Sequence, residues 1–403
     1  MDVRKAFLHG RVRREIYVEL PKEATQPADD VYVGRLNRTL YGTRDAPLEW
    51  ARLVNGFLKK LGLEASGVAP GVFCHRERDL QIVAHVDDFL IVGEQADVDW
   101  VTEKMQAEFE IKTKTIGFGR KDERSMKFLG RTITCEKESV SIEGDPKHVE
   151  ELLKENGMVG AKPVDTPYVK KDDEGTRELE GSEAKKFRRS AARINYVAQD
   201  RADLGFAARV VSGRMAHPRE EDWVILKRVL RYLCGKPRVK LQYFVQKSGN
   251  KLVVHTDSDW ASCEQTRRST SGGTVMNGKH LLSWWSKLQP RVALSSCEAE
   301  VNAIVRGVTE GLHLVYLGES LGRTLELELK TDASAAVGVM QRMGSGKLKH
   351  LSAKQLWVQE YVASEELQLT KIPREINHSD ALTHGWTNKE REFFCRMGFA
   401  DAW

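Results

Sequence analysis

Short apolar runs separated by charged and turn-forming residues fill the first part of the chain. The runs QIVAHV (81–86) and FLIV (89–92) flank two adjacent acids, Asp87 and Asp88. Both runs are rich in β-branched and aromatic residues and have the length of ordinary strands. The pattern predicts a β-hairpin that carries the aspartate pair at or beside its tip. Because adjacent like charges repel, the pair indicates either a bound divalent cation, for which carboxylate oxygens are suitable ligands, or a solvated turn.

The last region of the chain alternates strand and helix patterns, which is typical of an α/β domain. A strand is expected at 252–256, ending on Asp257, with further strands at 270–278 and 281–286. A long helix follows, because the residues of one helical face are all apolar. They are Val301, Ile304, Val308, Leu312 and Val315. A half-exposed strand then ends at Asp332, just before another helix.

Acids stand where elements of this region begin or end: Asp257, Glu298, Glu300, Asp332 and Asp380. Ser295 and Glu298 fit a capping box, so Glu298 has a structural explanation and Glu300 is left free to face a site. Structural explanations also exist for Asp332 as a helix N-cap and for Asp380, which we expect in the first turn of a terminal helix.

The pattern divides the chain into four regions: 1–145, 146–249, 250–390 and a C-terminal tail at 391–403. The first mixes short strands and helices. The second is largely helical and contains a charged stretch near 172–186, almost free of apolar residues, which reads as a linker. Its last helix ends at the Cys-Gly-Lys-Pro sequence of residues 234–237.

Composition narrows the class of protein. The chain has 403 residues, of which 41% are hydrophobic and 30% charged, as in soluble globular proteins of two or three domains. No apolar run approaches the roughly 20 residues of a membrane span, and no signal peptide is recognisable. The six cysteines form no C-x-x-C pair, so we expect reduced intracellular thiols with neither a disulfide framework nor a zinc site.

The positive charge is unevenly distributed. The net charge is +5, whereas residues 251–403 contain 18 basic and 18 acidic residues, so the excess lies in the first 250 residues. Within this part, Lys227, Arg228 and Arg231 are expected on one face of a helix. Such a face would suit a nucleic-acid backbone, and a solvated helix surface is the alternative.

Ordered motifs resemble a known family over nearly the whole chain. TDSDWA, RRSTSGG, WWSKLQPRVALSSCEAE, TDASAA, KHL and SDALTHG are similar to the RNase H domain of copia-type LTR retrotransposons. DVRKAFLHGRVRREIYVELP, LYGTRDAPLEW, HVDD and MKFLGRTI resemble motif A, motif B, the Asp-Asp motif and the following segment of the same elements' reverse transcriptase. KPVDTP and HPREEDWVILKRVLRYLCGK resemble the connecting region.

The resemblance implies a mixed α/β (α+β) fold: a polymerase palm, a helical connecting region and an RNase H-like domain with a central mixed sheet. Asp2, Asp87 and Asp88 would be the polymerase carboxylates, holding two Mg²⁺ ions. Phe7 would exclude a ribose 2′-hydroxyl, and the loop containing Gly42 and Pro47 would shape the nucleotide pocket. The helix with Lys227, Arg228 and Arg231 would contact the template-primer.

Three departures from the family pattern affect the polymerase. His85 stands where the family has tyrosine, and Asp45 replaces the usual glutamine of motif B, adding a negative charge near a triphosphate. The chain also starts one residue before Asp2, so we expect the fingers to be missing and the chain to be an N-terminally truncated fragment or genomic copy.

In the RNase H part, the resemblance makes Asp257, Glu300, Asp332 and Asp380 the ligands of two Mg²⁺ ions, with Mn²⁺ as an alternative. Asp259 would be a surface acid or would support the site from behind. His350 and His378 would position substrate or aid product release, or would be solvated or capping residues.

The resemblance also implies partners: an RNA template, a DNA primer, dNTPs and an RNA–DNA hybrid, but no membrane. The location would be the cytoplasm, in virus-like particles, with the nucleus as an alternative. Two other hypotheses stay open: a catalytically dead nucleic-acid-binding remnant, and a host protein that retains only the nuclease.

Overall fold

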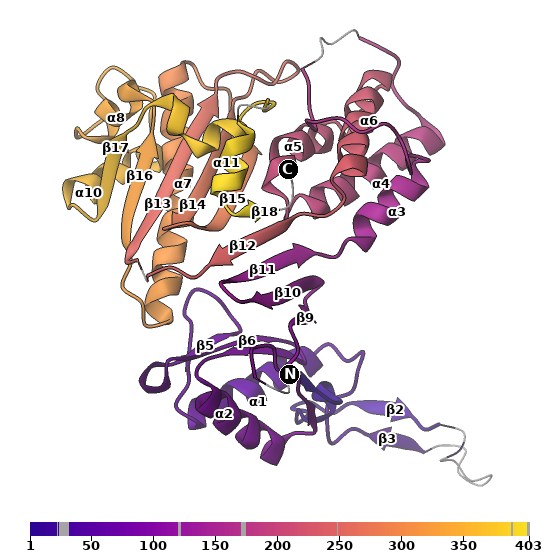
Figure 1. Cartoon of the computed structure of the whole chain (residues 1–403). Helices are drawn as coiled ribbons and strands as arrows, with labels where there is room; N and C mark the ends of the chain where they lie inside the picture. Colours follow the sequence, from indigo (N-terminus) through magenta and orange to yellow (C-terminus); the bar gives the residue numbers. More distant parts are fainter. Residues whose placement is uncertain are drawn as a thin grey trace. The chain divides into compact units, whose positions relative to one another are not determined.

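The computed structural model describes residues 1–21, 23, 32–119, 122–170, 175–247, 249–387 and 390–400. Two compact units make up the chain: Met1–Thr115 with Tyr316–Thr324, and Ile116–Val315 with Leu325–Trp403 (Figure 1). The boundaries of these two units differ from those of the four regions predicted from the sequence, and the four regions stay a prediction. Within the described residues, no helix combines the length and apolarity needed to cross a bilayer.

The first unit contains a six-stranded sheet in the order β4-β5-β6-β7-β1-β8. The strands are β1 (Asp2–Val3), β4 (Glu64–Ala65), β5 (Val72–His75), β6 (Leu80–His85), β7 (Asp88–Val92) and β8 (Ile111–Lys112). Helices α1 (Ala46–Lys60) and α2 (Gln95–Glu108), short helices η1 (Ala6–Leu8) and η3 (Arg76–Arg78), and the hairpin β2 (Tyr17–Glu19) and β3 (Val33–Arg35) complete it. Trp50, Val54 and Leu58 of α1 pack with Phe73, Ile82 and Phe89 of the strands in one core. The hairpin predicted around the aspartate pair is confirmed, because β6 and β7 pair antiparallel across Val86 and Asp87.

The second unit is built around a mixed sheet in the order β15-β14-β13-β16-β17. Its strands are β13 (Lys251–Asp259), β14 (Thr270–Asn277), β15 (His280–Leu288), β16 (Glu326–Thr331) and β17 (Leu367–Lys371). Strands β13, β14 and β15 are antiparallel, whereas β16 and β17 run parallel to β13. The α/β character and the mixed central sheet expected from the sequence are confirmed.

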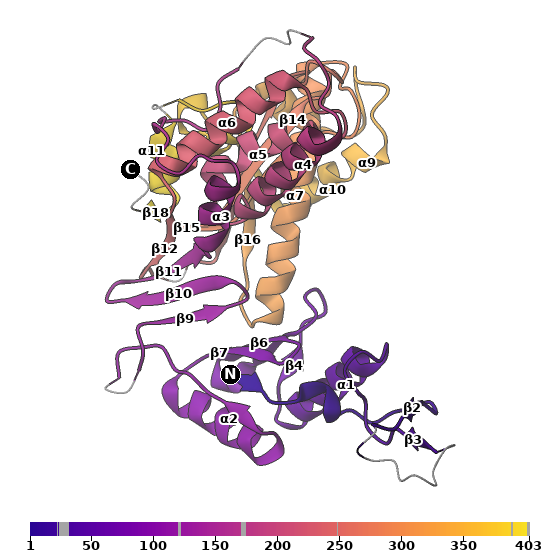
Figure 2. The same ribbon diagram turned by 90° about the vertical axis from the view of Figure 1, so that its right-hand side faces the viewer.

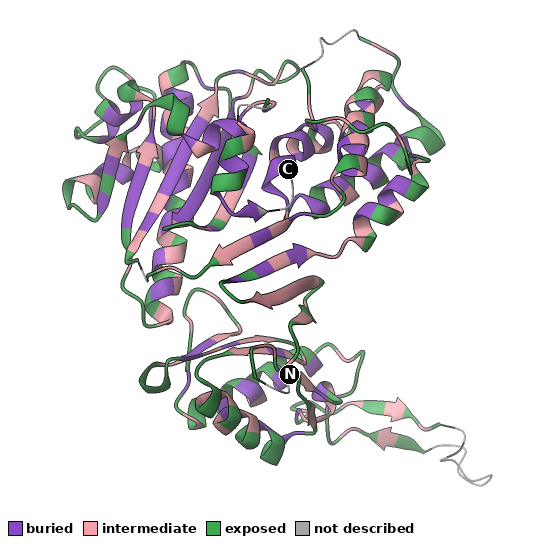
Figure 3. Ribbon diagram, in the orientation of Figure 1, coloured by how far each residue is buried: buried purple, intermediate pink, exposed green. Residues whose placement is uncertain are grey.

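Both faces of this sheet are covered, so its central strands are buried (Figure 3). Successive residues of a strand point to opposite faces. Val275 accordingly packs into the core beside α7 (Ser296–Ser320), and Met276 into the core of the helical region. The predicted apolar stripe of α7 is confirmed, since Val301, Ile304 and Val308 are fully buried. Gly307 lets α7 approach the sheet closely, because a methyl group there would overlap Thr256.

The helical region packs against the other face of the sheet. Its helices are α3 (Lys147–Glu155), α4 (Gly181–Val197), η4 (Ala202–Leu204), α5 (Gly205–Gly213) and α6 (Glu220–Gly235), of which α4, α5 and α6 lie side by side (Figure 2). A second, antiparallel sheet has the order β18-β12-β11-β10-β9. Its strands are β9 (Ser125–Phe128), β10 (Arg131–Glu136), β11 (Ser139–Gly144), β12 (Lys240–Phe244) and β18 (Phe399–Ala400).

The remaining elements of the second unit follow β16: α8 (Ser334–Met340), α9 (Ala353–Leu356), α10 (Val358–Ala363), η5 (Arg374–Ile376), η6 (His378–Leu382) and α11 (Arg391–Arg396). The helix expected around Asp380 is therefore wrong in type, because η6 is a short 3₁₀ helix. Asp332 is not an N-cap, since Ala333 caps α8 without a side-chain hydrogen bond.

Two further expectations need correction. The charged linker near 172–186 is shorter than predicted, because α4 already begins at Gly181 and buries Ala184 and Phe187; residues 172–174 lie outside the described residues. Residues 391–400 do not form a free tail. Phe393, Phe394 and Met397 pack into the helical core, since the chain end supplies apolar side chains at helical spacing.

Candidate active sites

Two acids stand at the carboxyl ends of neighbouring parallel strands of the mixed sheet. Strands β13 and β16 run in register, with His255 opposite Lys330, so Asp257 and Asp332 both follow two residues later. Asp257 is buried, with 7% of its surface exposed, whereas Asp332 is half-buried. The open end of parallel strands is where α/β folds usually bind ligands, which makes this edge a candidate site.

Glu300 reaches the same place from the first turns of α7. Its Oε1 accepts hydrogen bonds from the backbone N–H of Ser258, at 3.1 Å, and from the Ser258 hydroxyl, at 3.0 Å. Its Oε2 is buried and has no hydrogen-bond partner among the described residues. The contact with Ser258 fixes the carboxylate directly beside Asp257.

Glu298 faces elsewhere, as the capping argument predicts. The Ser295 hydroxyl accepts a hydrogen bond from the Glu298 N–H at 3.2 Å, which is the first half of a capping box. The second half is displaced by one residue, because Glu298 Oε2 accepts from Leu294 N–H, at 2.7 Å, instead of Ser295 N–H. The same oxygen lies 2.9 Å from Nε2 of His350, so His350 packs against the helix start.

Asp380, on η6, is held by two cationic side chains. Oδ1 lies 2.9 Å from Nη2 of Arg374, and Oδ2 lies 3.0 Å from Nε2 of His384. The hydroxyl of Thr383, one residue before His384, donates to Oδ2 of Asp257 and ties η6 to β13. Gly272 permits this contact, because a methyl group there would lie 2.7 Å from the side chain of Thr383 and 2.9 Å from the carbonyl of Ser379.

Burial and neighbouring charges shift the pKa values of Asp257, Glu300 and Asp380. Burial raises the pKa of Asp257 to about 6 against the hydrogen bond from Thr383, and the charges of Asp380 and Asp332 add to the increase. Burial and the charge of Asp257 raise the pKa of Glu300 to about 8. Although burial opposes it, the contacts with His384 and Arg374 hold the pKa of Asp380 below its ordinary value, and the bond to Asp380 raises the pKa of His384 to about 9.

The chemistry of this donor set fits a divalent cation. Carboxylate oxygens are the ligands that Mg²⁺ prefers, and a cation would relieve both the unpartnered Oε2 of Glu300 and the repulsion that raises the pKa of Asp257. Among the described residues, no three His, Cys, Asp or Glu side chains already stand close enough together to hold a metal ion.

His350 is exposed, as one of its alternatives has it, whereas His378 departs from the expectation. His378 is neither solvated nor a cap: its ring lies 4.7 Å from that of His255, and burial lowers their pKa values to about 4 and about 3, respectively. The sequence interpretation missed His384, although its spacing of four residues from Asp380 was a usable signal. It also missed Asn377, a fully buried residue that donates to the Thr256 carbonyl at 3.0 Å and to Asp332 at 3.4 Å.

A second group of acids lies in the first unit. Asp2 of β1 is paired with Asp88 of β7, and His85 of β6 is paired with the same Asp88. Paired residues of antiparallel strands point to the same face, so these three side chains are neighbours on one side of the sheet. Asp87 occupies the turn, where its carbonyl accepts from Val3 N–H at 2.9 Å. The backbone therefore brings Asp2 and Asp88, together with the turn residue Asp87, to the ends of the interior strands β1 and β7.

The three predicted nucleotide-pocket residues belong to the short helix η1, to a turn and to the start of α1. Phe7 is half-buried with its ring 5.0 Å from that of Tyr41. Gly42 has a φ of +89° that favours glycine, and Pro47 is in the first turn of α1. Asp45 does not stand as a bare negative charge, because Nε of Arg14 lies 2.5 Å from its Oδ2.

The three predicted basic residues of α6 do not share one environment. Arg228 donates to the Thr166 hydroxyl and Arg231 to the Lys162 carbonyl, both at 2.8 Å. Lys227 is exposed, whereas Arg228 and Arg231 are half-buried.

The chain is similar to known proteins. The model of the reverse transcriptase (RNA-dependent DNA polymerase) family matches residues 1–170. The Pol polyprotein of transposon TNT 1-94 from Nicotiana tabacum is 31% identical over 398 residues, covering 95% of this chain and 29% of the relative. The Pol polyprotein of transposon RE1 from Arabidopsis thaliana is 27% identical. The alignment covers 95% of this chain and 26% of that relative. The chain thus spans less than a third of the length of these relatives.

Solved structures match the mixed-sheet domain. LC11-RNase H1, isolated from compost, is 23% identical with a TM-score of 0.26 and covers 33% of this chain and 93% of its own. In complex with an RNA/DNA hybrid, the same protein gives 19% identity, a TM-score of 0.24, and coverage of 32% and 92%.

The family match and the long alignments define a retroelement polymerase region followed by an α/β domain. The chain is similar to a copia-type retrotransposon Pol region that contains a reverse transcriptase domain.

Proposed function

We propose that the α/β domain is an RNase H that hydrolyses the RNA strand of RNA–DNA hybrids with two divalent cations. The observation that carries the proposal is the arrival of Asp257, Glu300, Asp332 and Asp380 from four different elements at one end of the sheet. A purely structural role does not explain this cluster, because neighbouring negative charges that are partly buried destabilise the folded chain. The hybrid found with the compost RNase H supports the choice of substrate.

In this proposal, each carboxylate is oriented by a neighbour. Ser258 directs Oε1 of Glu300, Thr383 directs Asp257, and Asn377 directs Asp332. Bound to these four acids, Mg²⁺ or Mn²⁺ would activate the attacking water and stabilise the leaving 3′-oxygen. Arg374 and His384 keep Asp380 charged and supply positive charge beside the scissile phosphate.

For the first unit, we propose a reverse transcriptase palm in which Asp2, Asp87 and Asp88 bind the catalytic cations, with Phe7, Gly42 and Pro47 lining the nucleotide site. The register of β1, β6 and β7 supports this assignment. Bound cations would lower the pKa of the primer 3′-hydroxyl and stabilise displacement at the α-phosphate. His85, on the same face as Asp88, would border the primer end.

Incubation of the purified chain with a hybrid labelled on its RNA strand tests the nuclease. We expect cleavage of the RNA, and not of the DNA, in Mg²⁺ or Mn²⁺, and none in EDTA. Asp257→Asn is the matched inactive variant, because it keeps size and removes charge. Hybrid binding without cleavage by the unchanged chain would favour the nucleic-acid-binding remnant.

A further inference from the structure

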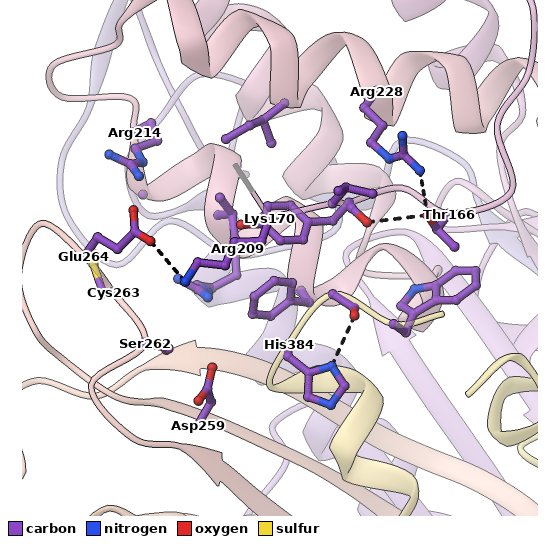
Figure 4. Close-up of a pocket in the computed structure, with 18 of the residues that line it drawn as sticks. Thr166, Lys170, Arg209, Arg214, Arg228, Asp259, Ser262, Cys263, Glu264 and His384 are labelled. Carbon is purple, nitrogen blue, oxygen red and sulfur yellow. Dashed lines mark hydrogen bonds and ion pairs between the residues drawn. The ribbon is translucent and has the colours of Figure 1, made fainter. Parts of the chain in front are cut away.

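A large cavity opens in the second unit beside the nuclease carboxylates. It has a volume of about 1230 Å³, which exceeds the 300 to 1,000 Å³ or so of ordinary small-molecule pockets. Residues 162–170, helices α5 and α6, and the segments 259–267 and 384–387 line it (Figure 4). We call it the basic cavity.

Positive charge dominates its lining. Seven lysine or arginine side chains line the basic cavity against three carboxylates. The four arginines that project from α5, α6 and the loop between them are Arg209, Arg214, Arg228 and Arg231. Lys170 is neutralised by Glu264 at 3.3 Å, and Arg214 lies 3.4 Å from Asp222. Arg209 has no carboxylate partner among the described residues and stacks on the ring of Phe206 at 4.6 Å.

Three of these guanidinium groups each contain one buried nitrogen without an acceptor among the described residues. Nε of Arg209, Nη1 of Arg214 and Nε of Arg228 are buried and have no hydrogen-bond partner among the described residues. Leaving such charged donors unsatisfied is unfavourable, and anion oxygens are acceptors that would satisfy them. Planar guanidinium groups match the geometry of phosphate and carboxylate groups and bind both bidentately.

The position of the cavity indicates which phosphates these are. Asp259, two residues beyond Asp257 on β13, lines the cavity, and so does His384, whose Nε2 contacts Asp380. Trp260, also in the lining, is 51% exposed. Tyr168 is half-buried and Phe206 is buried, with their rings 5.1 Å apart. An exposed aromatic ring among cations is typical of surfaces on which bases stack.

We propose that the basic cavity binds the sugar-phosphate backbone of the hybrid on one side of the cleaved phosphodiester, with Arg209 and Arg214 as its principal phosphate contacts. The assignment rests on the proposed nuclease, since it takes the hybrid as the ligand. The basic cavity would thus be a second contact site for the hybrid, in the helical region, in addition to the carboxylates.

Binding of a fluorescein-labelled 18-base-pair RNA–DNA hybrid, measured by anisotropy in EDTA with the full chain, tests the proposal without turnover. We expect R209Q/R214Q to raise the Kd by about tenfold or more at low salt. The slope of log K against log salt should fall by about two, since each phosphate contact contributes roughly 0.9. The control is K247Q/K279Q, which removes equal charge at exposed positions near the opposite end of the sheet.

A second variant guards against a folding defect. K162Q/R267Q changes two exposed residues of the cavity rim, so its melting temperature should equal that of the unchanged chain while its affinity falls in the same direction. Affinities and salt slopes of both cavity variants equal to those of the control would overturn the proposal. Displacement of the hybrid from the cavity by deoxynucleoside monophosphate at comparable concentration would also overturn it, because a small-anion site would then explain the charges. A chain that binds through the cavity but cleaves nothing would refute the nuclease and leave this site standing.

Discussion

At the scale of single residues, the two glutamates of SSCEAE show how position on a helix separates structure from chemistry. Two residues along a helix diverge by about 200°, and the structure gives the pair different neighbours accordingly. Glu300 meets Ser258 beside Asp257, whereas Glu298 meets Leu294 and His350. The contrast makes them a matched pair, because both can be changed to glutamine without altering size.

We expect Glu300→Gln to lower RNA cleavage by about 100-fold or more, because it removes a negative charge on which cation binding depends. Glu298→Gln should keep most of the activity, because its amide oxygen can still accept from Leu294 N–H. The measurement is Mg²⁺-dependent cleavage of a labelled hybrid, with melting curves as the check on folding. Equal loss in both variants would show that the helix start, and not the carboxylate of Glu300, is what matters.

The raised pKa of Glu300 has a consequence for stability. An acid whose pKa is higher in the folded than in the unfolded chain binds its proton better when folded, so stability falls as pH rises between the two values. For Glu300 this window runs from the ordinary value of 4.5 to about 8. In EDTA, Glu300→Gln should therefore melt several degrees above the unchanged chain at pH 8.5, with the difference shrinking toward pH 4.5. A difference independent of pH would contradict the assigned repulsion, and added Mg²⁺ should reduce it.

At the scale of elements, helices and strands with a regular hydrophobic pattern could be predicted from the sequence, whereas irregular elements could not. The apolar stripe of α7 and the runs that became β13, β14 and β16 were predicted because their buried faces repeat every 3.6 or two residues. The type of η6 was not, because its geometry depends on contacts with β13 and β14 from residues more than a hundred positions away. Arg374 and His384 are only six and four residues from Asp380, so distance along the chain does not explain why the sequence interpretation missed them.

Gly272 is the point where this irregular element meets the sheet. Gly272→Ala should push Thr383 and the Ser379 carbonyl away, at a cost of about 1 to 3 kcal/mol for overpacking. Because η6 carries Asp380, cleavage should fall far more than stability at a temperature where the variant is still folded. The measurements are urea unfolding and hybrid cleavage. Gly338→Ala in α8 is the control, since a methyl group there meets no other atom within 4 Å; a similar loss of activity in it would remove the special role of Gly272.

At the scale of the whole molecule, the sequence division at residue 249 does not coincide with a break in packing within the second unit. One hydrophobic core contains Phe187 and Leu230 of the helical region together with Leu281, Trp386 and Phe394 from beyond that position. A buried polar network crosses the same point: Arg201 and Tyr232 both bind the carboxylate of Asp203, and Nε1 of Trp386 donates to the Asp203 carbonyl at 2.8 Å. The sequence could not reveal this sharing, because each segment is amphipathic on its own and its partner is distant along the chain.

The shared core predicts how fragments will behave. A fragment of residues 250–403 should melt at least several degrees lower than one of residues 116–403 and bind a dye for exposed apolar surface, because it uncovers Leu281, Trp386 and Phe394. It should also cleave hybrid poorly, since Trp386 follows His384 and anchors the segment that contacts Asp380. The measurements are thermal unfolding, dye binding and cleavage at equal concentrations. As a control, Trp386→Phe in the longer fragment removes the bond to Asp203 and keeps an aromatic ring, so it should cost only about 1 kcal/mol. Equal melting temperatures and activities of the two fragments would mean that the nuclease domain folds independently of the helices packed against it.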